Sequence, residues 1–400
     1  MKQKNCYNFI KGMLAGILCV LCFISITKYF GIHLFSSSSL ADDIRTRAKV
    51  VESYIDRYYW KEDISDQKIS EYAAKGMVAA LGDRYSEYYT SQELKDHLEQ
   101  IEGDYAGIGA TMTVESETGA KKIFKLEKGM PAERAGLQVG DELLMVNGKD
   151  VAKLSLDEAV ALIKGEEGKK SVLTVKRTEK KKCVIKKITV VAEKIVTQSV
   201  QSKMLEDKIG YIAISNFTKE TVNQFEKSIE QLDKKNQKGL VIDLRNNGGG
   251  SLTACVTMLD RMLPKGDLIT EKNRATGDRQ YNSTDKQHFD KPVLILINGG
   301  SASASEVFAG CMQDRKAATL LGTKSYGKGI VQTIFSLENS CGGGIKLTTG
   351  EYVLPGKRCI QGKGLTPDVE EPYMGKSKIL GARDDNQLLK AMQVMKTILS

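Results

Sequence analysis

Histidine is scarce in this sequence, and its cysteines form no recognisable pattern. The 400 residues include three histidines, His33, His97 and His288, and none lies in a glycine-rich segment or at a strand end. A base must lie within hydrogen-bond reach of the nucleophile it activates, so a serine–histidine pair has little support. The eight cysteines include one C-x-x-C pair, Cys19 and Cys22, in an apolar run with no second pair. We therefore expect no metal site, no disulfide framework and no cofactor.

The charge balance is mildly basic, and by itself it excludes few classes of function or partner. Lys and Arg number 59 against 50 Asp and Glu, a formal net charge of +9, and no nucleic-acid-binding motif accompanies them. The densest basic cluster, residues 176–187, predicts a hairpin with a solvated tip. Contact with an anionic surface is the alternative for this cluster. We expect no nucleic-acid partner.

The N-terminal segment has the pattern of an export signal. Basic residues precede an apolar run at residues 13–26, and no acidic residue occurs among the first 41. Residues 12–35 are long enough to span a bilayer, and the positive charge before them predicts an exported body. We expect residues 1–36 to form a cytoplasmic basic tail and a signal-anchor, which makes this a single-pass protein of the cell membrane. Signal cleavage near residues 39–41, giving a secreted protein, is the alternative.

Four further regions differ in their hydrophobic periodicity. Residues 41–100 carry apolar residues at helical spacing, and residues 376–400 predict a terminal helix. Residues 101–195 combine short strands with two helices, whereas residues 196–375 alternate strands with helices. The chain therefore predicts several domains of different architecture.

The pattern of residues 101–195 resembles a PDZ domain. Its features come in the expected order, namely a glycine turn at 107–109, a short helix at 131–137, an Asn-Gly hairpin at 147–148 and a capped helix from 156. A PDZ domain captures the C-terminus of a peptide, which adds a strand to its sheet.

The resemblance to a PDZ domain suggests a peptide-binding site. The backbone amides of Gly107, Ile108 and Gly109 would hold the terminal carboxylate, and the following strand would pair with the peptide. Val160 and Ile163 would line the groove. The alternative is that these glycines only form a tight turn.

The alternation in residues 196–375 predicts parallel strands that are covered by helices on both faces. Functional residues in such sheets lie at the carboxyl ends of the strands. Two glycine-rich segments occur at such ends, residues 245–250 after an apolar strand at 239–244 and residues 298–301 after one at 293–297.

Hydroxyl groups gather at the second of these strand ends. Ser301, Ser303 and Ser305 lie where a helix begins, and Lys328 follows in a Gly-Lys-Gly setting. Lysine acts as a base only when neutral, so its pKa must fall by roughly three units, which burial can cause. Backbone amides of residues 247–250 and of Ala304 are candidate donors to an oxyanion. A surface lysine and an ordinary strand-to-helix loop are the alternatives.

These motifs together resemble the carboxy-terminal processing peptidases, tail-specific serine endopeptidases that contain PDZ domains. The resemblance rests on residues 243–250, 300–306, 326–329 with Gln332, and 362–368, and it extends to residues 76–86. It implies a crotonase-like α/β peptidase core with βαβ units, an inserted α+β PDZ domain and helical terminal segments. It also implies an exported endopeptidase for protein or peptide substrates with apolar C-termini.

The resemblance assigns roles to individual residues. It implies Ser303 as the nucleophile, Lys328 as the general base and Gln332 as the residue that orients this lysine. It implies the Ala304 amide and an amide of the Gly248-Gly249 segment as the oxyanion donors, and of this segment we prefer Gly249. Asp314 also matches a family position. Eleven residues along a helix place Asp314 about 16 Å from the nucleophile, so we interpret it as structural.

Two positions depart from the family pattern. Gly248 stands where proline is common, which should loosen the oxyanion loop, and Lys164 stands where some members carry an arginine proposed to sense substrate. Neither departure removes a catalytic group. A catalytically silent PDZ-type scaffold and an acyl-CoA enzyme are the alternative functions, and the apolar terminal helices suggest a homodimer.

Overall fold

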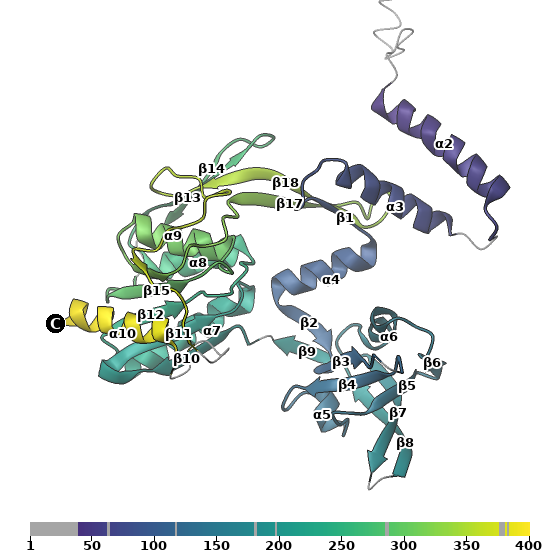
Figure 1. The fold of residues 1–400 in the computed structure, drawn as a ribbon, viewed down its shortest axis with the longest axis horizontal. Coiled ribbons are helices and arrows are strands. Elements are labelled where there is room, and N and C mark those ends of the chain that lie inside the picture. Colours follow the sequence, from purple (N-terminus) through teal and green to yellow (C-terminus); the bar gives the residue numbers. More distant parts are fainter. Residues whose placement is uncertain are drawn as a thin grey trace, which may run out of the picture. The chain divides into compact units, whose positions relative to one another are not determined.

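The computed structural model describes residues 39–61, 65–116, 118–179, 182–196, 198–284, 288–375, 381 and 384–400 (Figure 1). They belong to two units, Met1–Tyr72 and Ala73–Ser400, and each unit is described by itself. The signal-anchor expected at residues 1–36 lies outside these ranges, as does the tip of the expected basic hairpin at residues 180 and 181. Within the ranges, no helix combines the length and the apolar character needed to cross a membrane.

The expected N-terminal helices are present. Helix α2 (Leu40–Tyr58) begins at Ser39, whose side chain accepts a hydrogen bond from the Asp42 amide. Helix α3 (Asp66–Ala79) ends just before Gly82, which has a φ of 65°. Helix α4 (Ser91–Glu102) begins with a capping box that Thr90 and Glu93 form.

Residues 104–196 have the strand and helix order expected for the PDZ region. One sheet has the order β3 (Ala110–Val114), β4 (Lys121–Leu126), β5 (Glu142–Val146), β7 (Lys170–Glu179), β8 (Lys182–Val191), with β6 (Lys149–Asp150) paired to β5. Strand β2 (Asp104–Gly107) pairs with β9 (Glu193–Val196), and the helices are α5 (Pro131–Arg134) and α6 (Leu156–Ile163). Asn147 and Gly148 form the hairpin turn with φ angles of 50° and 83°.

The region expected to form a peptidase core has the expected parallel sheet. Its order is β10 (Val200–Met204), β11 (Ile209–Ile214), β12 (Gly239–Asp243), β15 (Val293–Ile297), β16 (Thr319–Gly322), β19 (Val369–Glu370), and only the β10–β11 pair is antiparallel. A short 3₁₀ turn, η1 (Glu206–Lys208), joins β10 to β11. Every residue of β12 and β15 is buried, as a strand covered on both faces requires.

Helices cover both faces of this parallel sheet. Helices α7 (Lys219–Lys234), α8 (Leu252–Met262) and α9 (Ala304–Asp314) pack on the face that carries Ile242 and Ile295. Helix α10 (Asn386–Leu399) packs on the opposite face, which carries Val241 and Leu296. The expected α/β core with helical termini is therefore confirmed.

A second sheet in the core region has no counterpart among the expected elements. It has the order β1 (Glu87–Tyr89), β18 (Gly344–Val353), β13 (Gly266–Asn273), β14 (Arg279–Ser283), and β17 (Ile330–Ser336) pairs with β18. Strand β17 begins two residues after Lys328, and β1 follows α3 in the chain. This sheet therefore connects the N-terminal helical region to the segment that carries the predicted base.

Candidate active site

Ser303 lies in a strained turn between β15 and α9. Its φ of 56° and ψ of −118° fall in a region that non-glycine residues rarely adopt, and such strain is concentrated at functional sites. A strained turn at the start of a helix resembles the way in which α/β-hydrolases expose a nucleophilic serine.

The hydroxyl groups of the three neighbouring serines differ in their partners. Ser301 Oγ donates to Leu244 O at 2.7 Å, and Ser305 Oγ donates to Asn247 O at 2.9 Å. Both of these side chains are fully buried. Ser303 is only half-buried. Its Oγ faces the Glu306 amide in a capping box at the start of α9, and it donates no hydrogen bond to a described residue. Ser303 is thus the one of these three serines whose hydroxyl proton has no acceptor in the described ranges.

The two predicted oxyanion donors lie side by side next to Ser303. Gly249 has a φ of 109°, and a Cβ built there would lie 2.8 Å from Ser303 Cβ and 3.0 Å from Ala304 N. The Ala304 amide has no hydrogen-bond partner in the part of the chain that the structure describes. The Gly249 amide instead donates to Asn247 Oδ1 at 2.9 Å. Gly248, in place of the family's proline, adds an exposed amide that a proline would lack.

The Glu306 carboxylate joins two segments of the site. One is the turn at Ser303, here called the serine turn, and the other is the loop at residues 323–329 that carries Lys328, here called the lysine loop. The carboxylate is fully buried, and its Oε2 accepts hydrogen bonds from the Ser303 amide at 3.0 Å and the Lys328 amide at 2.8 Å. Its Oε1 accepts from the Gly327 amide at 2.7 Å and from the Ser325 hydroxyl. Charge-assisted hydrogen bonds of this kind are the strong ones, so this one side chain fixes both segments against each other. The sequence analysis assigned Glu306 no role.

The motif at residues 362–368 packs against the backbone of the lysine loop. The Gly362 amide donates to Gly327 O at 2.9 Å, and a Cβ on Gly327 would lie 3.0 Å from Gly364 N. A Cβ on Gly329 would lie 2.6 Å from Gln361 N. The glycines on both sides of Lys328 are therefore required for this close backbone packing.

The Lys328 side chain is half-buried and rests on an aromatic ring. Its Nζ lies 4.9 Å from the centre of the Tyr85 ring. Burial, together with the nearby positive charges of Lys346 and Arg84, lowers the pKa of Lys328 below its ordinary value. This direction is the one that a lysine base needs.

The predicted contacts of Lys328 with the other catalytic candidates are not made in this structure. Among the described residues, its Nζ has no hydrogen bond to Ser303 or to Gln332. Gln332 Nε2 instead donates to Ile330 O at 3.5 Å. The roles of Lys328 and Gln332 therefore stay predictions.

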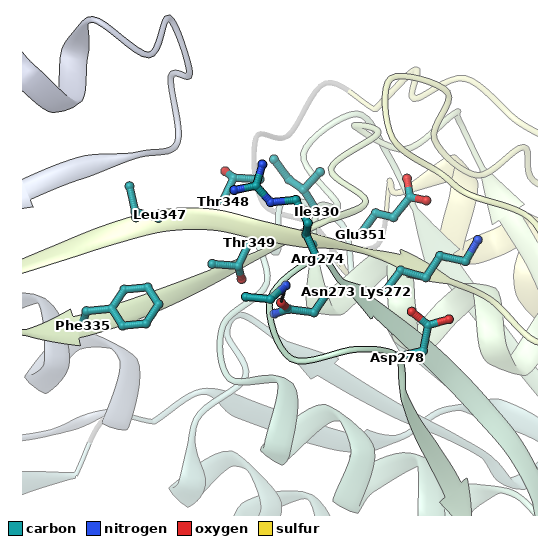
Figure 2. A pocket seen from close by; sticks show the side chains of 12 residues that line it. Lys272, Asn273, Arg274, Asp278, Ile330, Phe335, Leu347, Thr348, Thr349 and Glu351 are labelled. Carbon is teal, nitrogen blue, oxygen red and sulfur yellow. Dashed lines mark hydrogen bonds between the residues drawn. The ribbon is translucent and has the colours of Figure 1, made fainter. Parts of the chain in front are cut away.

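A groove of about 860 Å³ lies beside the lysine-bearing segment (Figure 2). It is formed by β17, β18 and the turn between β13 and β14, and it includes Ile330, two residues after Lys328. Apolar and charged side chains line it together: Ile330, Phe335, Leu347, Lys272, Arg274, Asp278 and Glu351.

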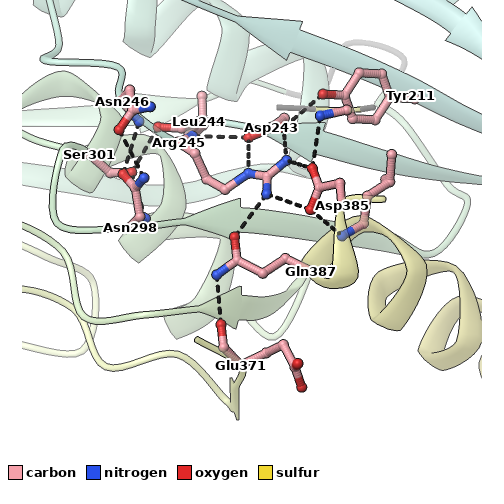
Figure 3. Close-up of polar contacts among 12 residues, drawn as sticks. Tyr211, Asp243, Leu244, Arg245, Asn246, Asn298, Ser301, Glu371, Asp385 and Gln387 are labelled. Atoms are coloured by element: carbon pink, nitrogen blue, oxygen red, sulfur yellow. Dashed lines mark hydrogen bonds and ion pairs between the residues drawn. The ribbon is translucent and has the colours of Figure 1, made fainter. Parts of the chain in front are cut away.

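A buried ion cluster lies next to residues 246–250, the loop that carries the predicted oxyanion donor Gly249 (Figure 3). Arg245 immediately precedes this loop, and its guanidinium donates to both carboxylate oxygens of Asp243 and of Asp385. Arg245 also donates to Gln387 Oε1 at 2.8 Å, and Tyr211 donates to Asp243 Oδ2 at 2.7 Å. Burial opposes the charge of Arg245, but the two carboxylates outweigh it and raise its pKa further. The cluster fastens α10 to the carboxyl end of β12.

Of the predicted peptide-binding residues, Gly107 ends β2, Ile108 and Gly109 form the turn between β2 and β3, and Val160 and Ile163 lie on α6. Gly109 has a φ of 71°, and a Cβ there would lie 2.3 Å from Met130 Cβ. The amides of Ile108 and Gly109 have no hydrogen-bond partner among the described residues, as a carboxylate-binding turn requires. Val160 is half-buried, whereas Ile163 is 5% exposed and packs in the domain core.

Two further residues that the sequence analysis named, Asp314 and Lys164, form contacts with neighbouring segments. Asp314 accepts a hydrogen bond from the Gly356 amide at 2.8 Å and forms an ion pair with Arg358 at 2.7 Å, which agrees with the structural interpretation of this residue. Lys164 pairs with Asp96 on α4 at 3.0 Å. Within the described ranges, no cluster of three or more His, Cys, Asp and Glu side chains has an arrangement that could hold a metal ion.

Comparisons with known proteins agree with this architecture. The model of peptidase family S41 matches residues 208–371, and a PDZ-domain model matches residues 125–177. A "Probable CtpA-like serine protease" of Staphylococcus aureus (strain COL) is 36% identical over 369 residues, which cover 91% of this chain and 72% of that protein. The "Carboxy-terminal processing protease CtpA" of Bacillus subtilis (strain 168) is 33% identical over 356 residues, 87% of this chain and 74% of that protein.

The solved structures include a photosystem II D1 C-terminal processing protease. It is 25% identical, with a TM-score of 0.47, and the match covers 83% of this chain and 88% of that one. The fold and the site together define a serine-type peptidase that carries a PDZ domain. The extent and identity of the sequence matches show that the chain belongs to the carboxy-terminal processing proteases of peptidase family S41. It is therefore a hydrolase.

Proposed function

We propose that Ser303 and Lys328 form a catalytic dyad. Ser303 Oγ attacks the scissile carbonyl while neutral Lys328 takes its proton, and the resulting ammonium then protonates the leaving amine. Water hydrolyses the acyl-enzyme with Lys328 again as the base. The observation that carries this proposal is the position of Ser303 in a strained turn, where its hydroxyl donates to no described residue and lies beside the unpaired Ala304 amide.

The oxyanion is held by backbone amides in this proposal. Ala304 N–H is one donor, because it lies at the start of α9 and has no partner in the described structure. Gly249 N–H is the second, once it exchanges Asn247 Oδ1 for the oxyanion. Removing one donor of this kind typically costs about 10²–10³ in kcat.

The dyad needs a movement of the lysine side chain before it can act. Lys328 Nζ lies on the Tyr85 ring, and Gln332 bonds to Ile330 O. Peptide binding at the PDZ domain would realign Lys328 and Gln332 with Ser303. The backbone of the lysine loop does not have to move, because Glu306 already holds it against the serine turn.

We propose that the PDZ domain captures apolar protein C-termini. Strand β3 is at the edge of its sheet, so a peptide can add as a further strand and place its carboxylate at the free amides of Ile108 and Gly109. The groove beside β17 would take the extended segment to be cleaved. Amidation of the substrate C-terminus should raise KM about tenfold, and an unchanged KM would remove the PDZ domain from substrate selection.

The cellular setting is also a proposal. We place the catalytic body outside the cytoplasm, tethered by residues 12–35, because a basic flank precedes their apolar run. A protease added to intact cells, from which any barrier outside the cell membrane has been removed, should then digest the catalytic body. Protection of the body in intact cells would contradict export.

The test of the dyad is hydrolysis of an unstructured protein with an apolar C-terminus by the full chain. Ser303→Ala and Lys328→Ala should each lower kcat/KM about 10³-fold or more, because the members of a catalytic unit fail together. Lys324→Ala is the matched control, since Lys324 is an exposed lysine of the same loop. Full activity of Lys328→Ala would refute the dyad, and loss only on Ser305→Ala would move the nucleophile.

A further inference from the structure

A loop from the N-terminal helical region covers the predicted base. Tyr85, in the turn between α3 and β1, presents its ring to Lys328 Nζ at 4.9 Å. The Arg84 guanidinium lies 4.6 Å from the Tyr85 ring and 5.6 Å from the Tyr326 ring, two residues before the lysine. Segments far apart in the chain thus meet at one point of the site.

The Tyr85 loop is firmly held in place. Asp83 accepts hydrogen bonds from the Tyr85 amide at 3.1 Å and from Ser86 Oγ at 2.6 Å. Ser86 Oγ in turn accepts from the Thr348 amide at 3.1 Å, and β1 pairs with β18 just beyond. The ring therefore lies on an anchored support, whereas the lysine side chain can rotate about its own bonds.

An aromatic face attracts an ammonium group but not a neutral amine. The ring therefore favours the protonated form of Lys328, the form that cannot accept a proton from serine. Four other charged or titratable groups interact with this ammonium. Asp83 favours its charge, Arg84 and Lys346 oppose it, and His97 is the fourth group. Only Tyr85 contacts the ammonium directly in the described structure.

We propose that Tyr85 is a positioning residue that holds protonated Lys328 away from Ser303 in the resting enzyme. The proposal rests on the Ser303–Lys328 dyad. When the Lys328 ammonium leaves the Tyr85 ring, it can lose its proton and its side chain can rotate toward Ser303. Loss of the aromatic contact and formation of the neutral base are therefore linked. Substrates that reposition the lysine overcome this contact, and substrates that do not are turned over slowly.

The test compares Tyr85→Leu with Tyr85→Phe in the full chain. The leucine variant keeps apolar volume without a π face, and we expect its kcat on a short peptide without an apolar C-terminus to rise about threefold. The pH midpoint of kcat should fall by about half a unit, because the protonated lysine loses a stabilising contact. Tyr85→Phe keeps the ring and should keep the wild-type midpoint. Tyr59→Leu, at an exposed tyrosine, is the matched control.

A second measurement does not depend on catalysis. It uses Ser303→Ala protein with ¹³C-dimethylated lysines, in which the Lys328 signal is assigned by Lys328→Arg. The ring should shift this signal upfield in protein that keeps Tyr85 and in the Tyr85→Phe variant, and the signal should be unshifted in Tyr85→Leu.

Two outcomes would overturn the inference. One is a Lys328 signal without the ring shift, and the other is a Tyr85→Leu variant with lower activity and an unchanged pH midpoint. A ring-shifted signal together with an active Lys328→Ala enzyme would refute the dyad and leave the contact standing.

Discussion

At the scale of single residues, Glu306 is the group on which the site geometry depends most. Its carboxylate accepts four hydrogen bonds from the serine turn and the lysine loop. Glu306→Gln keeps the shape but replaces one acceptor oxygen by a donor, so at least one backbone N–H facing it loses its partner. We expect kcat to fall about 10²-fold and the free energy of unfolding to fall by about 2 kcal/mol.

Peptide hydrolysis and urea unfolding measure these two effects. Glu230→Gln is the control, because Glu230 is an exposed glutamate on α7. If Glu306→Gln lowered stability and left kcat unchanged, the carboxylate would serve folding alone.

A second residue-scale prediction concerns the pH dependence of activity. Burial and the positive charge of Lys346 both lower the pKa of Lys328. Lys346→Met removes a like charge, which favours protonated Lys328 and raises its pKa. The midpoint of kcat/KM should therefore move to higher pH, by about half a unit. Lys235→Met, at the end of α7, should leave the midpoint unchanged, and a shift to lower pH in Lys346→Met would contradict the assignment.

The residue types at the site could be inferred from the sequence, but their partners could not. Ser303 and Lys328 stand in motifs whose glycines and hydroxyls have a chemical meaning. The acceptor role of Glu306 depends on donors about 20 residues further along the chain, which no local pattern reveals. The contact of Tyr85 with Lys328 joins still more distant segments. Long-range packing therefore decides which candidate groups meet.

At the scale of secondary-structure elements, Asp385 at the start of α10 pairs with Arg245, which precedes the loop of the predicted oxyanion donor Gly249. This carboxylate is fully buried and pairs with Arg245, which opposes the cost of burial and lowers the pKa of Asp385. Asp385→Asn leaves the buried Arg245 with only Asp243 as its counter-charge. We expect the free energy of unfolding to fall by about 3 kcal/mol at neutral pH.

The pH dependence of this loss has a definite sign. A carboxyl group with a depressed folded-state pKa contributes stability above its unfolded pKa of about 3.9 and loses it as pH falls through the folded value. The difference between wild type and Asp385→Asn should therefore shrink in acid, as denaturant unfolding at several pH values would measure. Asp384→Asn removes a neighbouring exposed carboxylate and is the control. An equal loss of stability in both variants would argue against the ion pair as the cause.

Elements with a clear hydrophobic pattern could be predicted from the sequence, whereas the second sheet could not. Strands β12 and β15 are short apolar runs between glycine-rich segments, so their burial follows from the sequence. Strand β18 has few fully buried residues, and β1 has only three residues. The pairing of Glu87 with Lys346 joins segments 259 residues apart, so no local signal specifies it.

At the scale of the whole molecule, the combination of a PDZ domain with a peptidase core follows from the order of the motifs. Family matches at residues 125–177 and 208–371 fall inside the two regions that the periodicity separated. Export and membrane attachment remain predictions from residues 1–36. The organisation of the N-terminal helices leads to a further prediction about assembly.

Helix α2 has a partly apolar face that the described residues of its own unit leave exposed. The helix has no buried residue, and Val50, Val51, Tyr54 and Tyr58 are 52–66% exposed at helical spacing. Most of the stability of helices in proteins comes from the packing of an amphipathic face, so this exposed face favours a partner. A second copy of the chain offers the same face, and self-complementary contacts of this kind produce twofold dimers. We therefore propose that α2 pairs with α2 of a second copy.

The expected result is a dimer of the full chain in detergent at micromolar concentration, measured by sedimentation equilibrium. Tyr54→Glu combined with Val50→Glu places charge on the shared face and should halve the protein mass, because a buried unpaired carboxylate costs several kcal/mol. Glu52→Lys changes a charge on the opposite side of α2 and should keep the dimer. A wild-type monomer, or a double variant that stays dimeric, would show that this face has another occupant.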